Sequence, residues 1–456
     1  MRVRTFFSLL VTAFLLLGIC EGQAWGQIVK VNCNRGETIT RALQALEAGP
    51  ITIEVKGICT ENIDIVLDDV TLIAANQSAT VNGPDAKKHT ITIRGHRAVI
   101  DGLTVTGGYN GINVSGVGGA QIRNCTVQNT FHNGIVFYQD GRGAVDKCTV
   151  QHNGHHGISI EAASAKVINS TISLNPGVGI VVSRGGNAKI GMNDVPGEPT
   201  AAGNTISNNG GHGINIWAGG SAYIIKNTIQ GNGTNYNAEY GRDGIHITMS
   251  TAVLAGENTI TMNQGCGVIA FSSSVYIGNS GYGVSTRNTI TQNGQSSQTI
   301  AKNGVYGVNG ASFSIYDADI SNNKGNGVTL NLHSSANING SIVNSNMGDG
   351  VTLWMNSGAN IVVSTINYNK GNGVTLALRS SANINGSSVN YTEHHGIVLT
   401  LGGGLVLGND VTVTGNFGWG LLCNDGESSW IGDPSVISGN GGGEGDPNIS
   451  GGCTPF

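Results

Sequence analysis

The sequence has 456 residues, 72 of them glycine, a formal net charge of -5 and only 11% charged residues. A negative chain without a basic cluster argues against a nucleic-acid partner, because phosphate backbones are held by Lys and Arg. The length allows two or three ordinary domains or one long array of repeats, and the glycine content favours the array.

The N-terminus is typical of a secretory signal peptide. The basic start MRVR precedes an apolar run from Phe6 to Ile19, too short to span a bilayer, and the small-residue site AWG follows. Cys20 stands where a lipoprotein is acylated, but the bulky residue before it disfavours lipidation. We expect cleavage after residue 26 and a secreted, periplasmic or cell-surface protein with no transmembrane segment in its mature part.

The segment GETITRALQALEAG, residues 36–49, predicts a short amphipathic helix. Thr38 is suited to the N-cap and Gly49 to the C-terminal stop. One face of this helix would carry the apolar residues Ile39, Ala42, Leu43 and Leu46.

From residue 111 onward, a glycine that mostly precedes Ile or Val recurs with a usual step of 23 residues. Each unit holds three short segments, such as GVTLNL, SANING and STINYN, in which β-branched and polar residues alternate. A leucine-rich repeat has a similar period but needs a leucine framework, which is missing. The units therefore predict three-sided coils stacked about 4.8 Å apart. The glycines are Gly111, Gly134, Gly157, Gly179, Gly213, Gly244, Gly267, Gly304, Gly327, Gly350, Gly373, Gly396 and Gly420.

A row of asparagines follows the third segment of most units, with threonine as the substitute in two. Amides stacked at a bend can bond to the coils above and below and so satisfy backbone groups that the turn leaves unpaired. We interpret the row as architectural. Its members are Thr130, Asn153, Asn175, Asn209, Asn232, Asn263, Asn293, Asn323, Asn346, Asn369, Thr392, Asn416 and Asn440.

These repeats and the preceding helix resemble the right-handed parallel β-helix proteins of the pectate-lyase type, over nearly all of the mature chain. The resemblance implies an all-β right-handed solenoid, closed at its N-terminal end by the helix, with the segment from Ile51 to Ala74 as its first strands. We divide the chain into a signal peptide (1–26), an N-terminal cap and first coils (27–110), regular repeats (111–419) and a C-terminal coil and cap (420–456). We expect a monomer.

Seven cysteines remain after cleavage in a protein exported to an oxidising compartment. Two pairs flank the chain ends and suit disulfides, Cys33 with Cys59 and Cys423 with Cys453. Cys125 and Cys148 occupy one position in consecutive coils and form either a disulfide or two buried thiols. Cys266 has no partner in this scheme.

The alternation of the first segment places two rows of side chains outward. The second row contains four aromatic residues, although only 5% of the chain is aromatic. Flat rings on a long sheet suit stacking on sugars, and the alternative is that flanking loops cover them. The aromatic residues are Tyr138, Trp217, Phe271 and Trp354.

The residue before each repeat glycine is usually Asn, Asp or His, which suits a turn. Here His212 and Asp243 should be neighbours in consecutive coils, with Arg242 and His246 beside them. The insertion TNYNAEYG adds Glu239 and Tyr240 to the same region. We take this middle third as the candidate site, because loops on a rigid scaffold often carry function.

The motifs RDGIHI and GHGI resemble parts of the polygalacturonase pattern, in which aspartates on successive coils hydrolyse a glycosidic bond. The next coil, however, brings QGCGVIA without paired aspartates, and the Arg-x-Lys element is missing. Inverting hydrolysis needs two carboxylates about 6.5 to 9.5 Å apart, which leaves Glu239 as the partner of Asp243. Calcium needs six to eight oxygen ligands, and the acidic residues are scattered, so we expect no metal and no cofactor.

Two functions remain open. The first is an exported repeat protein that binds extracellular or cell-surface polysaccharide without catalysis. The alternative is a polysaccharide lyase or glycoside hydrolase. The fold alone does not decide between them, since one fold hosts many functions.

Overall fold

The computed structural model describes residues 26–47, 49–195, 198–235, 241–279, 287–297, 301–441, 448–450, 452 and 454–455. Residues 1–25 of the predicted signal peptide, the loop residues Glu239 and Tyr240, and Cys453 lie outside this part of the chain. None of the helices described is long and apolar enough to cross a bilayer.

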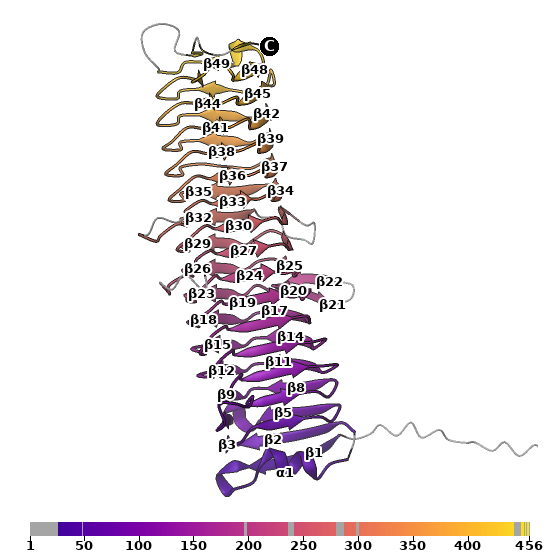
Figure 1. Cartoon of the computed structure of the whole chain (residues 1–456). Coiled ribbons are helices and arrows are strands. Elements are labelled where there is room, and N and C mark those ends of the chain that lie inside the picture. The colour runs from indigo at the N-terminus through magenta and orange to yellow at the C-terminus, as the bar shows by residue number, and fades with distance from the viewer. Residues whose placement is uncertain are drawn as a thin grey trace, which may run out of the picture.

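The chain forms one tall stack of coils that climbs steadily from the N-terminal to the C-terminal end (Figure 1). Each coil contributes strands to three long parallel sheets, here named A, B and C. The predicted all-β solenoid is confirmed.

Sheet A begins at the N-terminal end of the stack. Its strands are β1 (Gln27–Asn32), β2 (Ile51–Lys56), β5 (Val70–Ala74), β8 (Ala98–Asp101), β11 (Gly119–Arg123), β14 (Arg142–Asp146), β17 (Ser164–Ile168), β20 (Asn187–Ile190), β25 (Ser221–Ile224), β28 (Thr251–Leu254), β31 (Ser274–Ile277), β34 (Ser312–Tyr316), β37 (Ser335–Asn339), β39 (Gly358–Val362), β42 (Ser381–Asn385), β45 (Gly404–Leu407), β48 (Ser429–Ile431) and β50 (Thr454–Pro455).

Sheet B runs beside it along the stack. Its strands are β3 (Ile58–Thr60), β6 (Thr80–Gly83), β9 (Thr104–Gly107), β12 (Thr126–Gln128), β15 (Thr149–Gln151), β18 (Thr171–Ser173), β23 (Thr205–Ser207), β26 (Thr228–Gln230), β29 (Thr259–Thr261), β32 (Asn288–Thr291) and β35 (Ala318–Ser321). Later coils continue this face with the parallel pairs β40 (Thr365–Asn367) with β43 (Ser388–Asn390) and β46 (Val413–Thr414) with β49 (Ile437–Ser438).

Sheet C carries the candidate site. Its strands are β4 (Ile63–Ile65), β7 (Ile91–Ile93), β10 (Ile112–Ser115), β13 (Ile135–Tyr138), β16 (Ile158–Glu161), β19 (Ile180–Ser183), β24 (Ile214–Trp217), β27 (Ile245–Thr248), β30 (Val268–Phe271), β33 (Val305–Val308), β36 (Val328–Leu330), β38 (Val351–Leu353), β41 (Val374–Ala377), β44 (Ile397–Thr400) and β47 (Leu421–Cys423).

Equivalent strands pair in register from one coil to the next. Val328 pairs with Val351 and Val351 with Val374, each 23 residues apart, so the predicted repeat length is confirmed. Longer repeats keep the register, because Val268 still pairs with Val305, 37 residues further along the chain. One insertion forms the antiparallel hairpin β21 (Met192–Val195) and β22 (Glu198–Ala201) outside sheet A.

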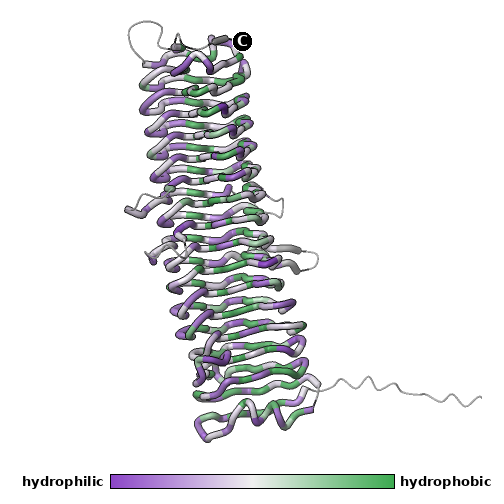
Figure 2. The backbone as a smooth tube through the Cα atoms, in the orientation of Figure 1, coloured by the Kyte–Doolittle hydropathy of each residue, from purple (hydrophilic) through white to green (hydrophobic). Residues whose placement is uncertain are grey.

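The core is a continuous apolar column inside the three sheets. In β24, Ile214 and Ile216 are fully buried, whereas Asn215 and Trp217 point outward. The hydrophobic residues repeat at the same place in successive coils (Figure 2). Stacking identical inward residues lets each coil bury its apolar side chains against its neighbours, which a single coil cannot do alone.

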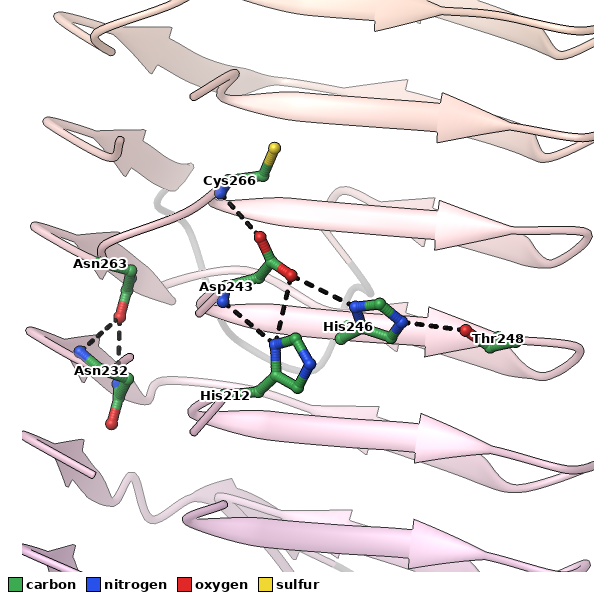
Figure 3. A network of polar contacts seen from close by, with 7 residues as sticks. All are labelled: His212, Asn232, Asp243, His246, Thr248, Asn263 and Cys266. Carbon is green, nitrogen blue, oxygen red and sulfur yellow. Dashed lines mark hydrogen bonds and ion pairs between the residues drawn. The ribbon is translucent and has the colours of Figure 1, made fainter. Parts of the chain in front are cut away.

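The predicted amide row is confirmed as a buried ladder. Oδ1 of Asn263 accepts both the backbone N–H and the side-chain amide of Asn232 at 3.0 Å, and Nδ2 of Asn232 also donates to the carbonyl of Ile206 at 3.0 Å (Figure 3). Thr130 joins the ladder through its hydroxyl, which donates to Oδ1 of Asn153 at 2.9 Å. The ladder satisfies the backbone at this turn in each coil.

The N-terminal cap contains α1 (Ile39–Gln44), shorter than the helix predicted over residues 36–49. The Thr38 hydroxyl accepts the N–H of Arg41 at 3.2 Å, as expected of the N-cap, and the apolar face packs on the core. Gly49 does not end the helix, which is a correction. The last turn tightens because the N–H of Leu46 bonds to the carbonyl of Leu43, and the chain then turns towards β2. Within the described residues, short 3-10 turns also lie at Cys33–Arg35, Ala75–Gln77 and Pro434–Val436.

The structure confirms one predicted disulfide and decides between the two alternatives left open for another cysteine pair. Cys33 and Cys59 are bonded, with 5.1 Å between their Cα atoms. Cys423 is also disulfide-bonded, and its predicted partner lies outside the described residues. Cys125 and Cys148, in contrast, are buried free thiols.

The two thiols are hydrogen-bonded to each other, and they occupy rungs of a second side-chain ladder. Cys125 Sγ donates to the carbonyl of Arg123 at 3.1 Å, and Cys148 Sγ to that of Asp146 at 3.3 Å. Asn227, at the same position in a later coil, donates to the carbonyl two residues before it in the same way. Both thiols are therefore reduced side chains of this ladder.

Candidate functional site

The outward rows predicted for sheet C are confirmed by the strand register. Asn215 pairs with His246, and Trp217 pairs with Thr248, which pairs with Phe271 one coil further on. Side chains of consecutive coils therefore stand about 4.8 Å apart along the stack. The two rows run straight along the outer face of the sheet, where Trp217 is exposed and others, such as Ser183 and Ala377, are buried.

The residues before the repeat glycines form a third ladder, one that the sequence analysis treated only as a turn. In this ladder a side-chain acceptor bonds to the backbone N–H of the equivalent residue one coil later. Asn133 receives the N–H of His156 at 3.0 Å, and Nδ1 of His156 receives that of Val178 at 2.9 Å. Histidine, asparagine and aspartate all serve in this position because each offers an acceptor at a similar reach.

His212 and Asp243 are consecutive members of this ladder, as predicted, and His246 joins them from β27 (Figure 3). Oδ2 of Asp243 lies 3.2 Å from Nδ1 of both His212 and His246, while Oδ1 accepts the N–H of Cys266 at 2.8 Å. The second ring nitrogen of His246 lies 3.0 Å from the hydroxyl of Thr248. The result is an aspartate held between two imidazoles.

The ladder fixes the proton positions in this cluster. Nδ1 of His212 is 3.0 Å from the N–H of Asp243 and 3.2 Å from its Oδ2, and it cannot accept from one and donate to the other. His156 and His395 accept the equivalent N–H with Nδ1, so we assign the acceptor role to His212 as well. His212 is then neutral, with its proton on Nε2, and His246 is the imidazole that donates to Asp243.

Burial and neighbouring charges have opposite effects on the pKa of His212, and likewise on that of Asp243. Burial lowers the pKa of His212, and the neighbouring Asp243 carboxylate only partly offsets this, which agrees with a neutral ring. Burial alone would raise the pKa of Asp243, but the two neighbouring imidazoles, of which His246 is the hydrogen-bond donor, outweigh burial and hold that pKa below its usual value. Asp243 is therefore ionised at neutral pH.

Gly241 covers the outer edge of His212. Its φ is +64°, and a Cβ built on it would lie 1.9 Å from both Cε1 and Nε2 of the imidazole. The backbone can approach the ring this closely only because glycine has no side chain. His212 is accordingly only 6% exposed.

Arg242, also predicted in the site, faces a different direction. It is buried, and Nη1 donates to the hydroxyl of Ser296 at 3.1 Å, so it braces neighbouring coils. Glu239 and Tyr240 are not among the described residues. Cys266 supplies its N–H to Asp243, and burial raises the pKa of its thiol well above the usual value.

A groove of about 320 Å³ lies on sheet C immediately before this cluster. His212 and Trp217 form one end of it, and Ser183 of β19 and Glu161 of β16 stand in line with Trp217 in the two preceding coils. The far end is lined by three histidines that the sequence analysis missed, His132, His155 and His156. A run of His-containing turns at the 23-residue spacing was the signal that could have found them.

The missed histidines belong to a stack of rings along the solenoid. Tyr109 lies over His132 with 4.7 Å between ring centroids, and His132 over His155 with 4.5 Å. Burial lowers the pKa of His132, and burial together with neighbouring histidines lowers that of His155 to about 4 and that of His156 to about 3. These rings are therefore neutral at neutral pH.

Two polar atoms in the groove lack a partner. Nδ1 of His132 and Oδ1 of Asn215 are buried from solvent, yet neither has a hydrogen bond within the described part of the chain. The charged lining residue Glu161 is different, because it is paired with Arg184 at the rim. Buried polar atoms are normally satisfied, so two unpaired ones in a single groove need an explanation.

The predicted aromatic residues fall into different settings. Trp217 borders the groove and is 38% exposed, and Phe271 packs near His246 with 5.4 Å between the rings. Tyr138 stands in the same row, one strand before Glu161. Trp354 is exposed on a later coil, away from the groove lining.

A metal ion would find three ligand atoms here, since His212, Asp243 and His246 offer atoms that all lie within 4.8 Å of one another. The Nδ1 lone pair of His212, however, already receives the N–H of Asp243. The set also contains two nitrogens and one carboxylate, which differs from the oxygen cage that calcium prefers. The expectation that the protein binds no metal ion therefore stays a prediction.

The family model described as "Right handed beta helix region" matches residues 110–198 and 160–339, together about half of the chain. The Cell surface glycoprotein of Methanothermus fervidus is 36% identical over 137 residues, 29% of this chain, and the chain spans 22% of that relative's length. The solved pectate lyase Pel9A is 17% identical, with a TM-score of 0.36 over 64% of this chain and 78% of its own. A double mutant of the periplasmic alginate epimerase AlgG is 12% identical, with a TM-score of 0.37 over 94% and 84%. The chain belongs to the right-handed β-helix family.

Proposed function

We propose that this protein is exported and binds an extracellular polysaccharide in the groove on sheet C, between His132 and Trp217. The observation that carries the proposal is the pair of unpaired polar atoms in the groove, Nδ1 of His132 and Oδ1 of Asn215. A sugar has hydroxyls all around its ring, which can donate to or accept from both atoms. A ligand of this kind would remove the cost of leaving them buried and unpaired.

Trp217 supplies the second element of such a site. Its ring is partly exposed at the edge of the groove and stands in line with Ser183 and Glu161 along the stack. Binding sites commonly combine an aromatic surface with a small number of fixed polar groups. An extended polysaccharide lying along the sheet would meet a new coil about every 4.8 Å, close to the length of one sugar unit.

Export is supported by three independent features. The first 26 residues have the pattern of a signal peptide, Cys33 and Cys59 form a disulfide, and the curated relative is named a cell surface glycoprotein. Disulfides persist in oxidising compartments. We therefore place the protein outside the cytoplasm.

The binding proposal is tested by measuring the affinity of the mature protein for a panel of soluble neutral and acidic polysaccharides. Trp217→Ala should weaken binding about ten-fold or more, as expected when a central aromatic contact is removed. Trp354→Ala is the matched control, since it removes the same residue type from the same face outside the groove. Equal affinities of wild type and Trp217→Ala, with both proteins folded, would show that the groove is not the site.

Catalysis is the second candidate, and the contact between Asp243 and His246 favours it. A carboxylate that holds an imidazole, with the other ring nitrogen directed at a hydroxyl on the outer face of the strand, is the arrangement of a general base. Thr248 then marks the place where a reacting hydroxyl would lie. The reaction would be cleavage of the bound polysaccharide by elimination or hydrolysis.

The catalytic candidate predicts new reducing ends, or the ultraviolet-absorbing unsaturated ends of a lyase, from a polysaccharide that binds. Asp243→Asn should abolish their release and keep the fold, because asparagine occupies this ladder position in other coils. Asp349→Asn is the matched control: Asp349 has the same ladder role, but its Oδ2 accepts from Thr352 and Thr375 instead of meeting histidines. A bound polysaccharide that yields no new ends with the wild type would exclude this candidate and leave the binding proposal intact.

A further inference from the structure

The groove on sheet C contains no uncompensated positive charge among the residues described. Its lining consists of histidine, asparagine, serine, valine and tryptophan side chains, and Glu161 is its charged member. Arg184 stands at the rim, but it is paired with Glu161. Behind His212 lies Asp243, a second negative charge.

The histidines do not supply the missing charge at neutral pH. Burial lowers the pKa of His132 and of His212, and it lowers those of His155 and His156 to about 4 and about 3. Nδ1 of His156 and of His212 also accepts a backbone N–H, which fixes each as an acceptor on that side. The groove therefore offers neutral donors and acceptors next to two carboxylates.

This charge pattern has a direct consequence for the ligand. A uronate or sulfate group that enters the groove would lose water without gaining a cation, and burying an unpaired charge is costly. The hydroxyls of a neutral sugar would instead pair with His132, Asn215 and the two lining serines, Ser159 and Ser183. A carboxylate such as that of Glu161 is a good acceptor for sugar hydroxyls, because bonds to ionised acceptors are the stronger ones.

We propose that the groove selects neutral sugar units and rejects uronate or sulfated ones, an inference that rests on the proposed function. Arg184 plays the central part in this selection. Glu161 neutralises the guanidinium that would otherwise attract anions to the rim. Specificity then arises because a charged sugar finds no free cation in the groove, as well as from attractive contacts with sugar hydroxyls.

The test compares a neutral polysaccharide with its own oxidised form, in which primary hydroxyls have become carboxylates. Hydroxyethyl cellulose, mannan and galactan are the starting probes, each measured beside its oxidised derivative at pH 7.5 and low salt. The oxidised form should bind at least about ten-fold more weakly, equivalent to 1.4 kcal/mol. Oxidised forms that bind as well as the neutral ones, or acidic polymers as the sole binders, would overturn the inference and leave the proposed function standing.

A charge variant tests the mechanism itself. Glu161→Gln keeps the side-chain shape and leaves Arg184 unpaired. The ratio of the affinities for the neutral and the oxidised polysaccharide should therefore fall at least about three-fold. Added salt should restore the ratio, because it screens the attraction between Arg184 and the carboxylates. Glu257→Gln is the control, because Glu257 is likewise paired, with Lys226, but on sheet B. An unchanged preference in Glu161→Gln would refute the role of this pair. Absence of binding to every probe, with folded protein, would instead refute the proposed function.

Discussion

Nδ1 of His212 accepts the backbone N–H of Asp243, one coil further along the solenoid, at 3.0 Å. The bond has the same geometry as those made by Asn133, Asn326 and Asn372 in other coils. His212 therefore has two roles, since it is a rung of a structural ladder and also a wall of the groove. A substitution must separate these roles before any loss of binding can be assigned to the site.

His212→Asn and His212→Leu make that separation. Asparagine keeps an acceptor for the Asp243 N–H, so we expect the melting temperature to change by only about 1–2 °C, whereas leucine leaves the N–H buried and unpaired at a cost of about 1–3 kcal/mol. Both variants remove the imidazole from the groove. Calorimetry of the two proteins checks this, and equal melting temperatures would show that the ladder bond contributes nothing.

The amide ladder makes a stronger stability prediction at Asn369. Its Oδ1 accepts the backbone N–H and the side-chain amide of Asn346, each at 3.0 Å, and its Nδ2 donates to the carbonyl of Val343 at 2.9 Å. Asn369→Leu leaves these buried groups unpaired, and we expect a loss of roughly 3–6 kcal/mol.

The control for Asn369→Leu is Asn383→Leu, which places the same change on an exposed site of sheet A. We expect that variant to stay within about 0.5 kcal/mol of the wild type. Chemical denaturation of both proteins gives the comparison. A normal midpoint for Asn369→Leu would mean that other groups or water take over these bonds.

The sequence predicted the scaffold well because the scaffold is periodic. Inward residues such as Ile214 and Ile216, and ladder residues such as Asn263, recur at one spacing, and each coil repeats the constraint of the last. The same regularity predicts that His212 lies beside Asp243, as it does. Periodicity alone did not decide one case, because equal positions for Cys125 and Cys148 are compatible with a disulfide and with the two free thiols that the structure shows.

The groove was harder to predict for a physical reason. It depends on turns and on side-chain direction, neither of which the strand period determines. Arg242 has the expected position but points to Ser296, and the turn residues His132 and His155 line the groove although neither stands in an outward row of the sheet. A side chain outside the regular strands is placed by its local contacts, so only the structure reveals it.

A substitution at Gly241 should disturb the groove by displacing the neighbouring His212 ring. Gly241→Ala would place a methyl group 1.9 Å from the His212 ring, at a residue with φ of +64°, so the ring must move or the turn must open. We expect binding to fall about ten-fold or more, because His212 lines the groove. Gly310→Ala is the control, since φ is +75° there but nothing lies within 4 Å of the added carbon. A Gly241→Ala variant that binds normally would show that the position of His212 is unimportant.

The histidine stack should make the protein sensitive to acid. The pKa of His155 is lowered from 6.5 to about 4 and that of His156 from 6.5 to about 3, chiefly by burial. Between pH 6.5 and about 4 the unfolded chain binds protons at these residues and the folded chain does not, so stability is lost as the pH falls through this range. Asp243, whose pKa is lowered from 3.8, acts only below this range.

The double variant His155→Asn/His156→Asn tests this. Asparagine at position 156 keeps an acceptor for the N–H of Val178, so the ladder survives while two titrating groups are removed. Both rings are partly exposed, and we expect the variant to lose roughly 1–2 kcal/mol less stability than the wild type between pH 7 and pH 4.5. His333→Asn, on an exposed turn, is the control and should follow the wild type. Parallel pH profiles of stability for all three proteins would show that the stacked imidazoles protonate as easily in the folded state as in the unfolded chain. That result would also contradict the description of the groove histidines as neutral.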